Sequence, residues 1–195
     1  FKWFAGRRDV LHQMSLCSIN LSGQSVGDPD MQGFIRERVM IHRLPPGKFC
    51  FEVTETAVME DIGRSINFIE ALRRDGFKFA IDDFGSGLAS FGYLKRLPVD
   101  FVKIDGMFVK DIEEDDTHEA IVASIDQISK VMGKETIAEF VENDRVARRL
   151  AGIGVDYVQG YGVGRPEPIA RLAERLGKFR APHLKLISDV GQGGA

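Results

Sequence analysis

Seven polar side chains stand in, or just after, short apolar runs that are typical of β-strands. They are Asn20, Glu52, Asp82, Asp83, Lys103, Glu139 and Gln159. Carboxylate and amide oxygens are the ligands that hard divalent cations prefer. In a (βα) barrel, such side chains meet at the mouth formed by the C-terminal ends of the strands. Side chains of these types, delivered to one mouth from several strands, can therefore bind divalent metal ions.

Asp82 and Asp83 are the strongest candidates for metal ligands. Adjacent residues of a strand face opposite sides, so only one of them would point into a barrel. Where the strand ends and the chain turns, both carboxylates can reach one metal. Two neighbouring carboxylates repel each other unless a cation neutralises them. The alternative is a solvated turn that caps a helix, because Asp-x-x-Gly sequences are common in loops.

The other candidates have equally ordinary alternatives. Lys103 lies between Val102 and Ile104, and a buried lysine is costly unless a carboxylate pairs with it. A lysine that runs along an outer face, with its ammonium group in water, is the simpler reading. Asn20 can be a polar strand end bonded to the backbone. Glu52 and Glu139 can be exposed strand positions.

The apolar runs alternate with segments of helical periodicity. Strands are expected at 15–22, 49–56, 77–83, 101–105, 135–141 and 157–161, and helices at 3–13, 30–43, 61–75, 88–96, 115–132, 143–151 and 167–177. This alternation predicts an α/β fold with a parallel sheet and helical crossovers. No G-x-G-x-x-G or P-loop sequence follows the first strand, and the polar strand ends favour a TIM-like barrel. A full barrel has eight units and about 250 residues, so about six units are expected here, with the front two missing.

The bulk properties describe an ordinary globular domain. The chain has 195 residues, 44% of them hydrophobic, and a net charge of −3, which gives no electrostatic case for a nucleic-acid polymer or a membrane surface. Cys17 and Cys50 fall in predicted strands and are expected to be buried, reduced thiols. The four histidines share no metal spacing. We expect a domain over residues 1–177, a loosely held tail over 178–195, and a cytoplasmic location, although the parent protein could be anchored in a membrane.

Six segments resemble, in order, the EAL family of cyclic-di-GMP phosphodiesterases. They are Ser18–Ser22 (SINLS), Phe51–Thr56 (FEVTET), Asp82–Gly87 (DDFGSG), Val102–Asp105 (VKID), Ala138–Glu142 (AEFVE) and Gln159–Tyr161 (QGY), the last followed by Arg165-Pro166. The resemblance runs from about residue 3 to about residue 177. The Glu-Ala-Leu motif that names the family is absent from the sequence. The resemblance places it before residue 1, on a strand upstream of Ser18, and its glutamate is a metal ligand in the family.

The resemblance implies roles for particular residues. Two Mg²⁺ or Mn²⁺ ions would be held by Asn20, Glu52, Asp82, Asp83 and Glu139. Lys103 would orient or help to deprotonate the attacking water, and Glu55 would anchor the loop 82–87, although alone it reads as a solvated loop carboxylate. Gln159 would position the substrate or the water. Asp105 and Glu142 are weaker candidates for hydrogen bonds to the substrate.

The implied activity is hydrolysis of one phosphodiester bond of cyclic-di-GMP, which gives linear pGpG. The alternatives are a non-catalytic domain that binds the dinucleotide as a receptor, and an inactive truncated fragment. The resemblance also implies a homodimer, and a parent protein in which GGDEF and sensor domains precede this one.

Overall fold

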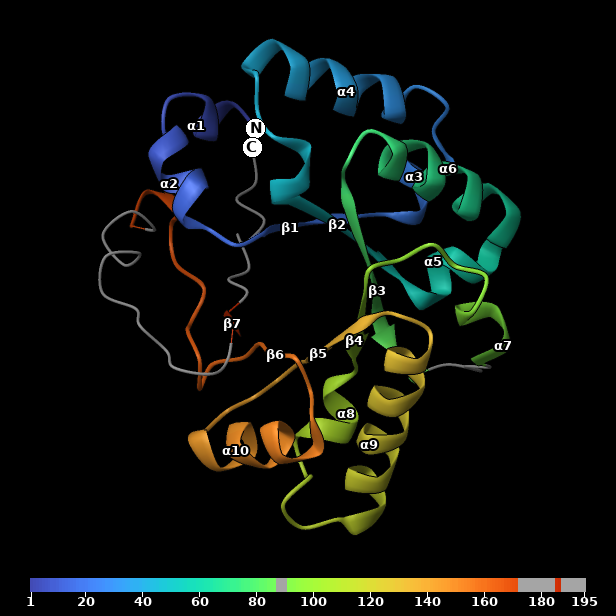
Figure 1. Ribbon diagram of the computed structural model, residues 1–195, viewed down its shortest axis with the longest axis vertical. Coiled ribbons are helices and arrows are strands. Elements are labelled where there is room, and N and C mark those ends of the chain that lie inside the picture. The colour runs from blue at the N-terminus through green and yellow to red at the C-terminus, as the bar shows by residue number, and fades with distance from the viewer. Residues whose placement is uncertain (87–90, 172–184, 187–195) are drawn as a thin grey trace.

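A curved, wholly parallel sheet organises the chain (Figure 1). The computed structural model describes residues 1–86, 91–171 and 185–186. The strands of this part of the chain are β1 Cys17–Leu21, β2 Phe49–Thr54, β3 Lys78–Phe84, β4 Phe101–Ile104, β5 Glu135–Ala138, β6 Tyr157–Val158 and β7 Lys185–Leu186. Each strand pairs in parallel with the next one in the chain. This unpermuted order is that of a TIM-like barrel wound in one direction, as predicted.

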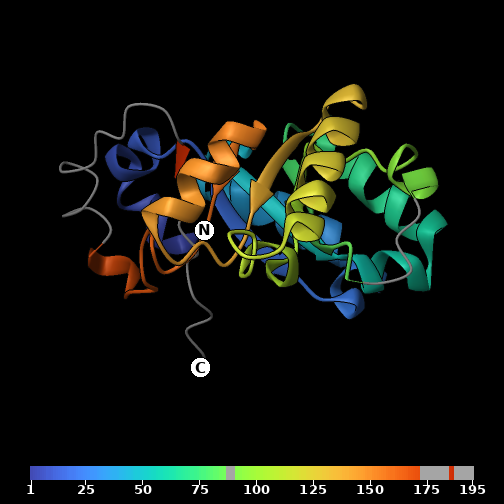
Figure 2. The same ribbon diagram turned by 90° about the horizontal axis from the view of Figure 1, so that it is seen from below.

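Helices connect the strands and surround the sheet (Figures 1 and 2). The long helices are α4 Met31–His42, α6 Ile62–Arg74, α9 Asp116–Val131 and α10 Asp144–Ile153. The short helices are α1 Lys2–Ala5, α2 Arg8–Gln13, α3 Gly23–Gly27, α5 Glu55–Glu60, α7 Phe91–Leu94 and α8 Gly106–Val109, and 3₁₀ helices lie at Pro46–Lys48 and Ile169–Arg171.

Local capping explains where the long helices begin and end. The side chain of Asp61 accepts a hydrogen bond from the backbone N–H of Arg64 at the start of α6. Asn143 does the same for two N–H groups at the start of α10. Gly154 ends α10 with a φ of 116°, a left-handed conformation that glycine adopts without strain. These short signals explain why the helices expected at 61–75 and 143–151 are found within about two residues of those bounds.

The six predicted strands are confirmed in place, but several details of the prediction were wrong. The helix expected at 3–13 is two short helices, α1 and α2. The strand expected at 49–56 ends at Thr54, because the Thr54 side chain caps α5 by accepting a hydrogen bond from the N–H of Ala57. The short helices α3, α5 and α8 and the strand β7 were not predicted. Residues 88–90, residues 172–177 of the expected last helix, and the expected tail apart from 185–186 lie outside the described residues.

The strands are buried on both faces, as in other parallel sheets covered by helices. One face packs against the helices through large side chains, among them Phe51, Phe79 and Phe84. On the other face lies a smaller apolar cluster made of Cys50, Ala80, Phe101, Ile137 and Tyr157. Cys17 and Cys50 are buried free thiols, as expected, and burial raises the pKa of Cys17 to about 11.

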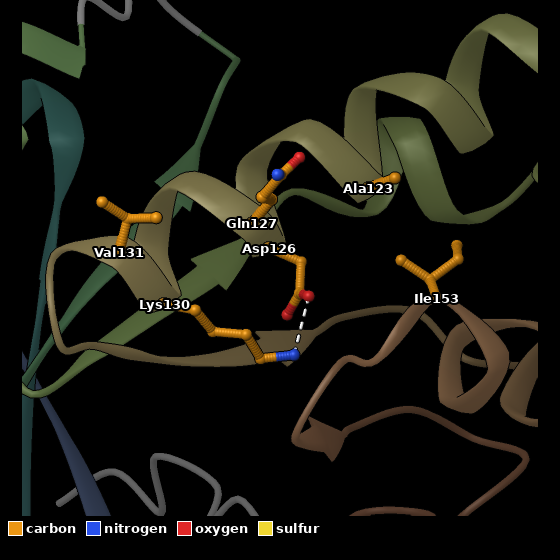
Figure 3. A pocket seen from close by; sticks show the side chains of 6 residues that line it. All are labelled: Ala123, Asp126, Gln127, Lys130, Val131 and Ile153. Atoms are coloured by element: carbon orange, nitrogen blue, oxygen red, sulfur yellow. Dashed lines mark hydrogen bonds and ion pairs between the residues drawn. The ribbon is translucent and has the colours of Figure 1, made fainter.

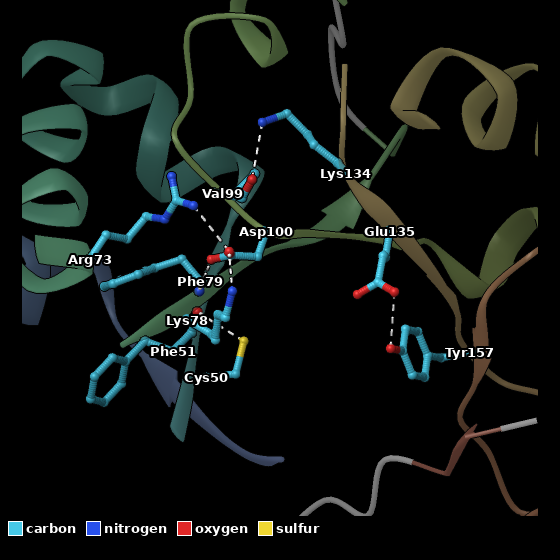
Figure 4. Close-up of polar contacts among 10 residues, drawn as sticks. All are labelled: Cys50, Phe51, Arg73, Lys78, Phe79, Val99, Asp100, Lys134, Glu135 and Tyr157. Atoms are coloured by element: carbon cyan, nitrogen blue, oxygen red, sulfur yellow. Dashed lines mark hydrogen bonds and ion pairs between the residues drawn. The ribbon is translucent and has the colours of Figure 1, made fainter. Parts of the chain in front are cut away.

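Polar contacts tie together the N-terminal ends of the strands (Figure 4). Asp100, just before β4, accepts hydrogen bonds from Arg73, from Lys78 and from the backbone N–H of Phe79. Lys134, just before β5, donates to the carbonyl groups of Leu97 and Val99. All these charged groups are hydrogen-bonded within the fold, so they stabilise this end of the sheet, and the opposite end is where a barrel of this kind carries its chemistry.

None of the helices in the described part of the chain is long and apolar enough to cross a membrane.

Candidate metal centre at the C-terminal ends of the strands

A buried lysine is the centre of the polar cluster at the C-terminal ends of the strands. The Nζ atom of Lys103, on β4, lies 2.8 Å from Glu52 of β2, 2.7 Å from Asp82 of β3 and 2.9 Å from Glu139, which directly follows β5. Lys103 is 2% exposed, Glu52 1% and Glu139 8%. The lysine is therefore not on an outer face, and the sheet brings four of the predicted site residues into contact.

A β-bulge in β3 sets the positions of the two aspartates. The β3–β4 register runs from Ile81 opposite Val102 to Phe84 opposite Ile104, so Asp82 and Asp83 together oppose the single residue Lys103. Asp83 adopts a left-handed conformation with a φ of 54°. A bulge redirects side chains that would otherwise alternate between faces. The two carboxylates therefore reach the same side of the sheet within β3 itself. The expectation that they would do so at a turn after the strand was wrong.

The donor set fits divalent cations. Asp82, Asp83 and Glu139 each offer a carboxylate oxygen, and these oxygens lie within 4.8 Å of one another. On the neighbouring strand β1, Asn20 pairs in register with Glu52, so its amide extends the row of oxygen donors. Three carboxylates contact the one ammonium group of Lys103, and Asp83 lies beside two of them, so the acids of the cluster outnumber the lysine. A donor set made only of oxygen atoms is typical of sites for hard divalent cations.

Burial and mutual repulsion perturb the acids of this cluster. Burial raises the pKa of Glu139 to about 7, with a further contribution from Asp82, and Lys103 opposes the shift. Burial also raises the pKa of Glu52, again against the effect of Lys103. Burial, Asp82 and Asp105 raise the pKa of Asp83. Burial alone would lower the pKa of Lys103, but the surrounding carboxylates outweigh it and raise that pKa. Lys103 therefore stays protonated, and the acids around it are more easily protonated than free carboxyl groups.

Glu55 holds the backbone that follows the two aspartates. It is the first residue of α5 and is buried, and its carboxylate accepts a hydrogen bond from the N–H of Gly85 at 3.1 Å. Gly85 has a φ of 100°, and a Cβ atom there would lie 2.8 Å from the ring of Phe108. Glu55 is thus not the solvated loop carboxylate of the simpler interpretation.

Tyr93 is a residue near Glu55 that the sequence analysis missed. Burial raises the pKa of Tyr93, and Glu55 adds to that shift, so the phenol stays neutral beside the carboxylate. A tyrosine in an expected helix carries no sequence signal of this contact.

The remaining candidates lie at the same ends of the strands but outside the cluster around Lys103. Asp105 follows β4 and caps α8 by accepting a hydrogen bond from the N–H of Met107 at 2.8 Å. Gln159 follows β6 and is half-buried, and its backbone is bonded to Ala138 and Val141. Glu142 is exposed. The structure therefore places these three near the mouth, after the strands that carry the cluster.

A pocket of about 570 Å³ lies elsewhere, between α9 and the end of α10 (Figure 3). Its lining includes Asp126 and Lys130, which form an ion pair at 2.7 Å, and Ile153. None of the metal-ligand candidates lines it. Asp126 also accepts a hydrogen bond from Thr136, so both of its carboxylate oxygens have partners within the fold.

Comparison with known proteins supports the reading of the sequence. The model of the EAL domain matches residues 3–166. The cyclic di-GMP phosphodiesterase PdeB of Shewanella oneidensis is 48% identical over 176 residues, which are 90% of this chain and 20% of that protein. The chain thus spans about a fifth of the length of this curated relative.

Solved structures show the same fold. The structure described as the PaMucR phosphodiesterase in complex with c-di-GMP has a TM-score of 0.77 and 30% identity, over 88% of this chain and 72% of that one. A manganese and cyclic-di-GMP complex of BlrP1 from Klebsiella pneumoniae has a TM-score of 0.76 and 32% identity, over 84% of this chain and 42% of that one.

Proposed function

Because this chain belongs to the EAL domain family, we propose that it is the hydrolytic domain of a cyclic-di-GMP phosphodiesterase that depends on divalent metal ions. The observation that carries the proposal is the cluster in which Lys103 contacts Glu52, Asp82 and Glu139 from three different strands. Each of these residues also stands at a position matched by the family's segments.

The proposed ligands of two Mg²⁺ or Mn²⁺ ions are Asn20, Glu52, Asp82, Asp83 and Glu139. When bound, the ions would make a water molecule more acidic and stabilise negative charge on the phosphate. The excess of carboxylates over ammonium groups supports this assignment, because a bound cation relieves the repulsion that otherwise raises the pKa values of these acids. The manganese complex of a similar structure supports it independently.

The reaction that we propose opens the ring of the dinucleotide at one phosphate. The oxygen of a water molecule forms a bond to phosphorus, the bond from phosphorus to the ribose 3′ oxygen breaks, and the leaving oxygen takes a proton. The product is linear pGpG. Lys103 lies within 3 Å of three acids of the site, where its ammonium group can orient the water and hold the carboxylates in place.

Other residues have supporting roles in the proposal. Glu55 keeps the segment after Asp83 in position through the N–H of Gly85. Gln159 positions the substrate or the water, and Asp105 and Glu142 contribute hydrogen bonds to the substrate.

The test is turnover of cyclic-di-GMP by the purified chain with MgCl₂ or MnCl₂, with pGpG followed by ion-exchange chromatography. We expect product that disappears with EDTA and with Asp82→Asn. The control is Asp75→Asn, since Asp75 is an exposed residue paired with Arg36 on the helices. Binding of the dinucleotide without any product would instead support a non-catalytic receptor, and neither binding nor product would overturn both functions.

The wider context of the domain is part of the same proposal. The domain would act as a homodimer, within a longer protein that carries GGDEF and sensor domains. A cytoplasmic location agrees with two buried cysteines that remain free thiols.

A further inference from the structure

Phe140 has an unusual backbone conformation at the mouth of the sheet. It directly follows Glu139 and has a φ of 53°, in the left-handed region that favours glycine. A bulky residue in this region is a true outlier and carries strain. The short polar side chain that eases the same conformation at Asp83 is absent here. Such strain persists where the surrounding structure or a function requires it.

The side chain of Phe140 is also exposed, although it is large and apolar. It is 51% exposed. Its ring lies against Gly106, the first residue of α8, where a Cβ atom would come within 2.1 Å of the ring. Gly106 follows Asp105 at the end of β4, two residues beyond Ile104. The fold thus leaves room for this one ring next to the carboxylate cluster, with much of its surface open to solvent.

A positive charge lies over the same ring. The Nζ atom of Lys110 is 4.3 Å from the centroid of the Phe140 ring. Lys110 is exposed and follows α8. The lysine side chain is long and flexible, so its ammonium group can move from the ring to a nearby anion. An exposed ring and a movable cation are the two groups that bind a nucleotide, through its base and its phosphate.

We propose that Phe140 and Lys110 form a binding subsite for one purine base of the dinucleotide and the phosphate next to it. The inference rests on the proposed function and deepens it by assigning a contact to the base. The base stacks on the ring of Phe140, and the ammonium group of Lys110 pairs with the phosphate that the metal centre does not hold. The strained backbone of Phe140 is then the cost of presenting an aromatic ring at this place.

The test compares Phe140→Gly with the wild-type chain for affinity and for thermal stability. Affinity is measured in Ca²⁺ for cyclic-di-GMP, for GMP and for ribose 5-phosphate, after checking that no turnover occurs. Loss of stacking on one base corresponds to roughly 5- to 150-fold weaker binding. We expect this loss for cyclic-di-GMP and GMP, little change for ribose 5-phosphate, and an unchanged or higher melting temperature, because glycine relieves the strained φ.

Two further variants separate stacking from general damage. Phe140→Trp keeps an aromatic face and should retain affinity. Phe34→Ala is the matched control, because Phe34 on α4 is 49% exposed and has Arg38 5.0 Å from its ring centroid, and it follows neither β4 nor β5. It should leave affinity unchanged. Lys110→Met should weaken the binding of ribose 5-phosphate as well as the binding of GMP, because both ligands carry the phosphate.

Three results would overturn the inference. The first is that Phe140→Gly binds GMP as tightly as the wild type does. The second is that Phe140→Gly loses as much affinity for ribose 5-phosphate as for GMP. The third is that its melting temperature falls while its affinity for the dinucleotide is unchanged. If Phe140→Gly is unchanged while the wild type hydrolyses cyclic-di-GMP, the subsite alone is wrong. If the wild type neither binds nor hydrolyses the dinucleotide, the subsite and the proposed function fail together.

Discussion

Replacing Lys103 by methionine should strongly destabilise the metal-free protein. The substitution keeps the length of the side chain and removes the charge that contacts Glu52, Asp82 and Glu139. Removal of one partner from a buried ion pair costs about 3–5 kcal/mol of unfolding free energy, because the remaining charge is buried without compensation. For a chain of this size, each kcal/mol shifts the melting temperature by about 2–4 °C. The expected loss in EDTA is therefore roughly 6–20 °C.

Divalent metal should restore much of this loss. Without the ammonium group, the carboxylates bind a cation more tightly, so MnCl₂ should raise the melting temperature of Lys103→Met by more than that of the wild type. Turnover should fall in the variant even with saturating metal, because the lysine also orients the water in the proposed reaction. The measurement is differential scanning fluorimetry with and without MnCl₂, beside an activity assay.

The matched control for Lys103 is Lys78→Met. Lys78 is also a strand lysine in an ion pair, 2.8 Å from Asp100, but its side chain is 44% exposed. Exposed pairs contribute about 0–1 kcal/mol, so its melting temperature should fall by less than about 4 °C. If Lys103→Met melts in EDTA within 2 °C of Lys78→Met, then Lys103 does not balance the acids and the electrostatic argument is wrong.

Three other predictions concern the acids of the site. Asp82→Asn should abolish hydrolysis, with the far-ultraviolet circular dichroism spectrum unchanged, and full activity would contradict its role as a ligand. Glu55→Ala should lower turnover about 10- to 150-fold, because a hydrogen bond to a charged group is worth about 1.5–3 kcal/mol. Glu55→Gln keeps an acceptor for the N–H of Gly85 and should lose less turnover. Equal losses in the two variants would count against the role of Glu55 as an anchor. The pKa of Glu139 is raised from 4.5 to about 7, so its contribution to stability in EDTA is present below pH 4.5 and about 3 kcal/mol is lost as the pH rises through 7. Metal binding displaces that proton, so metal affinity measured by calorimetry should rise about tenfold per pH unit below 7 and level off above it, and a flat profile would refute the shift.

Much of the fold could be predicted because local signals and the global pattern agree. Apolar runs alternate with amphipathic segments, and capping residues such as Asp61 and Asn143 mark the helix starts. The strand ends, in turn, place Glu52, Lys103 and Glu139 at one mouth. Once the strands are parallel and in chain order, these three positions must approach one another.

The rest could not be read from local patterns. The bulge at Asp82 and Asp83 depends on the register with β4, which involves residues about twenty positions away. Glu55 is buried because the strand ends at Thr54, whose side chain caps α5. The β-branched residues of 49–56 had indicated a strand that continues past Glu55. The strained Phe140 has no sequence signal at all, since phenylalanine favours an ordinary strand conformation.

The bulge also determines which mutations this strand can tolerate. Two acids face one lysine only because β3 carries a residue more than β4 between matched positions. Deleting either aspartate would restore an even pairing of the two strands and leave three carboxylates, in place of four, around Lys103. As such sequences diverge, a substitution at this point would change one ligand, whereas the loss of a single codon would remove one ligand and also shift the direction of the other, because the bulge that redirects both side chains would be gone.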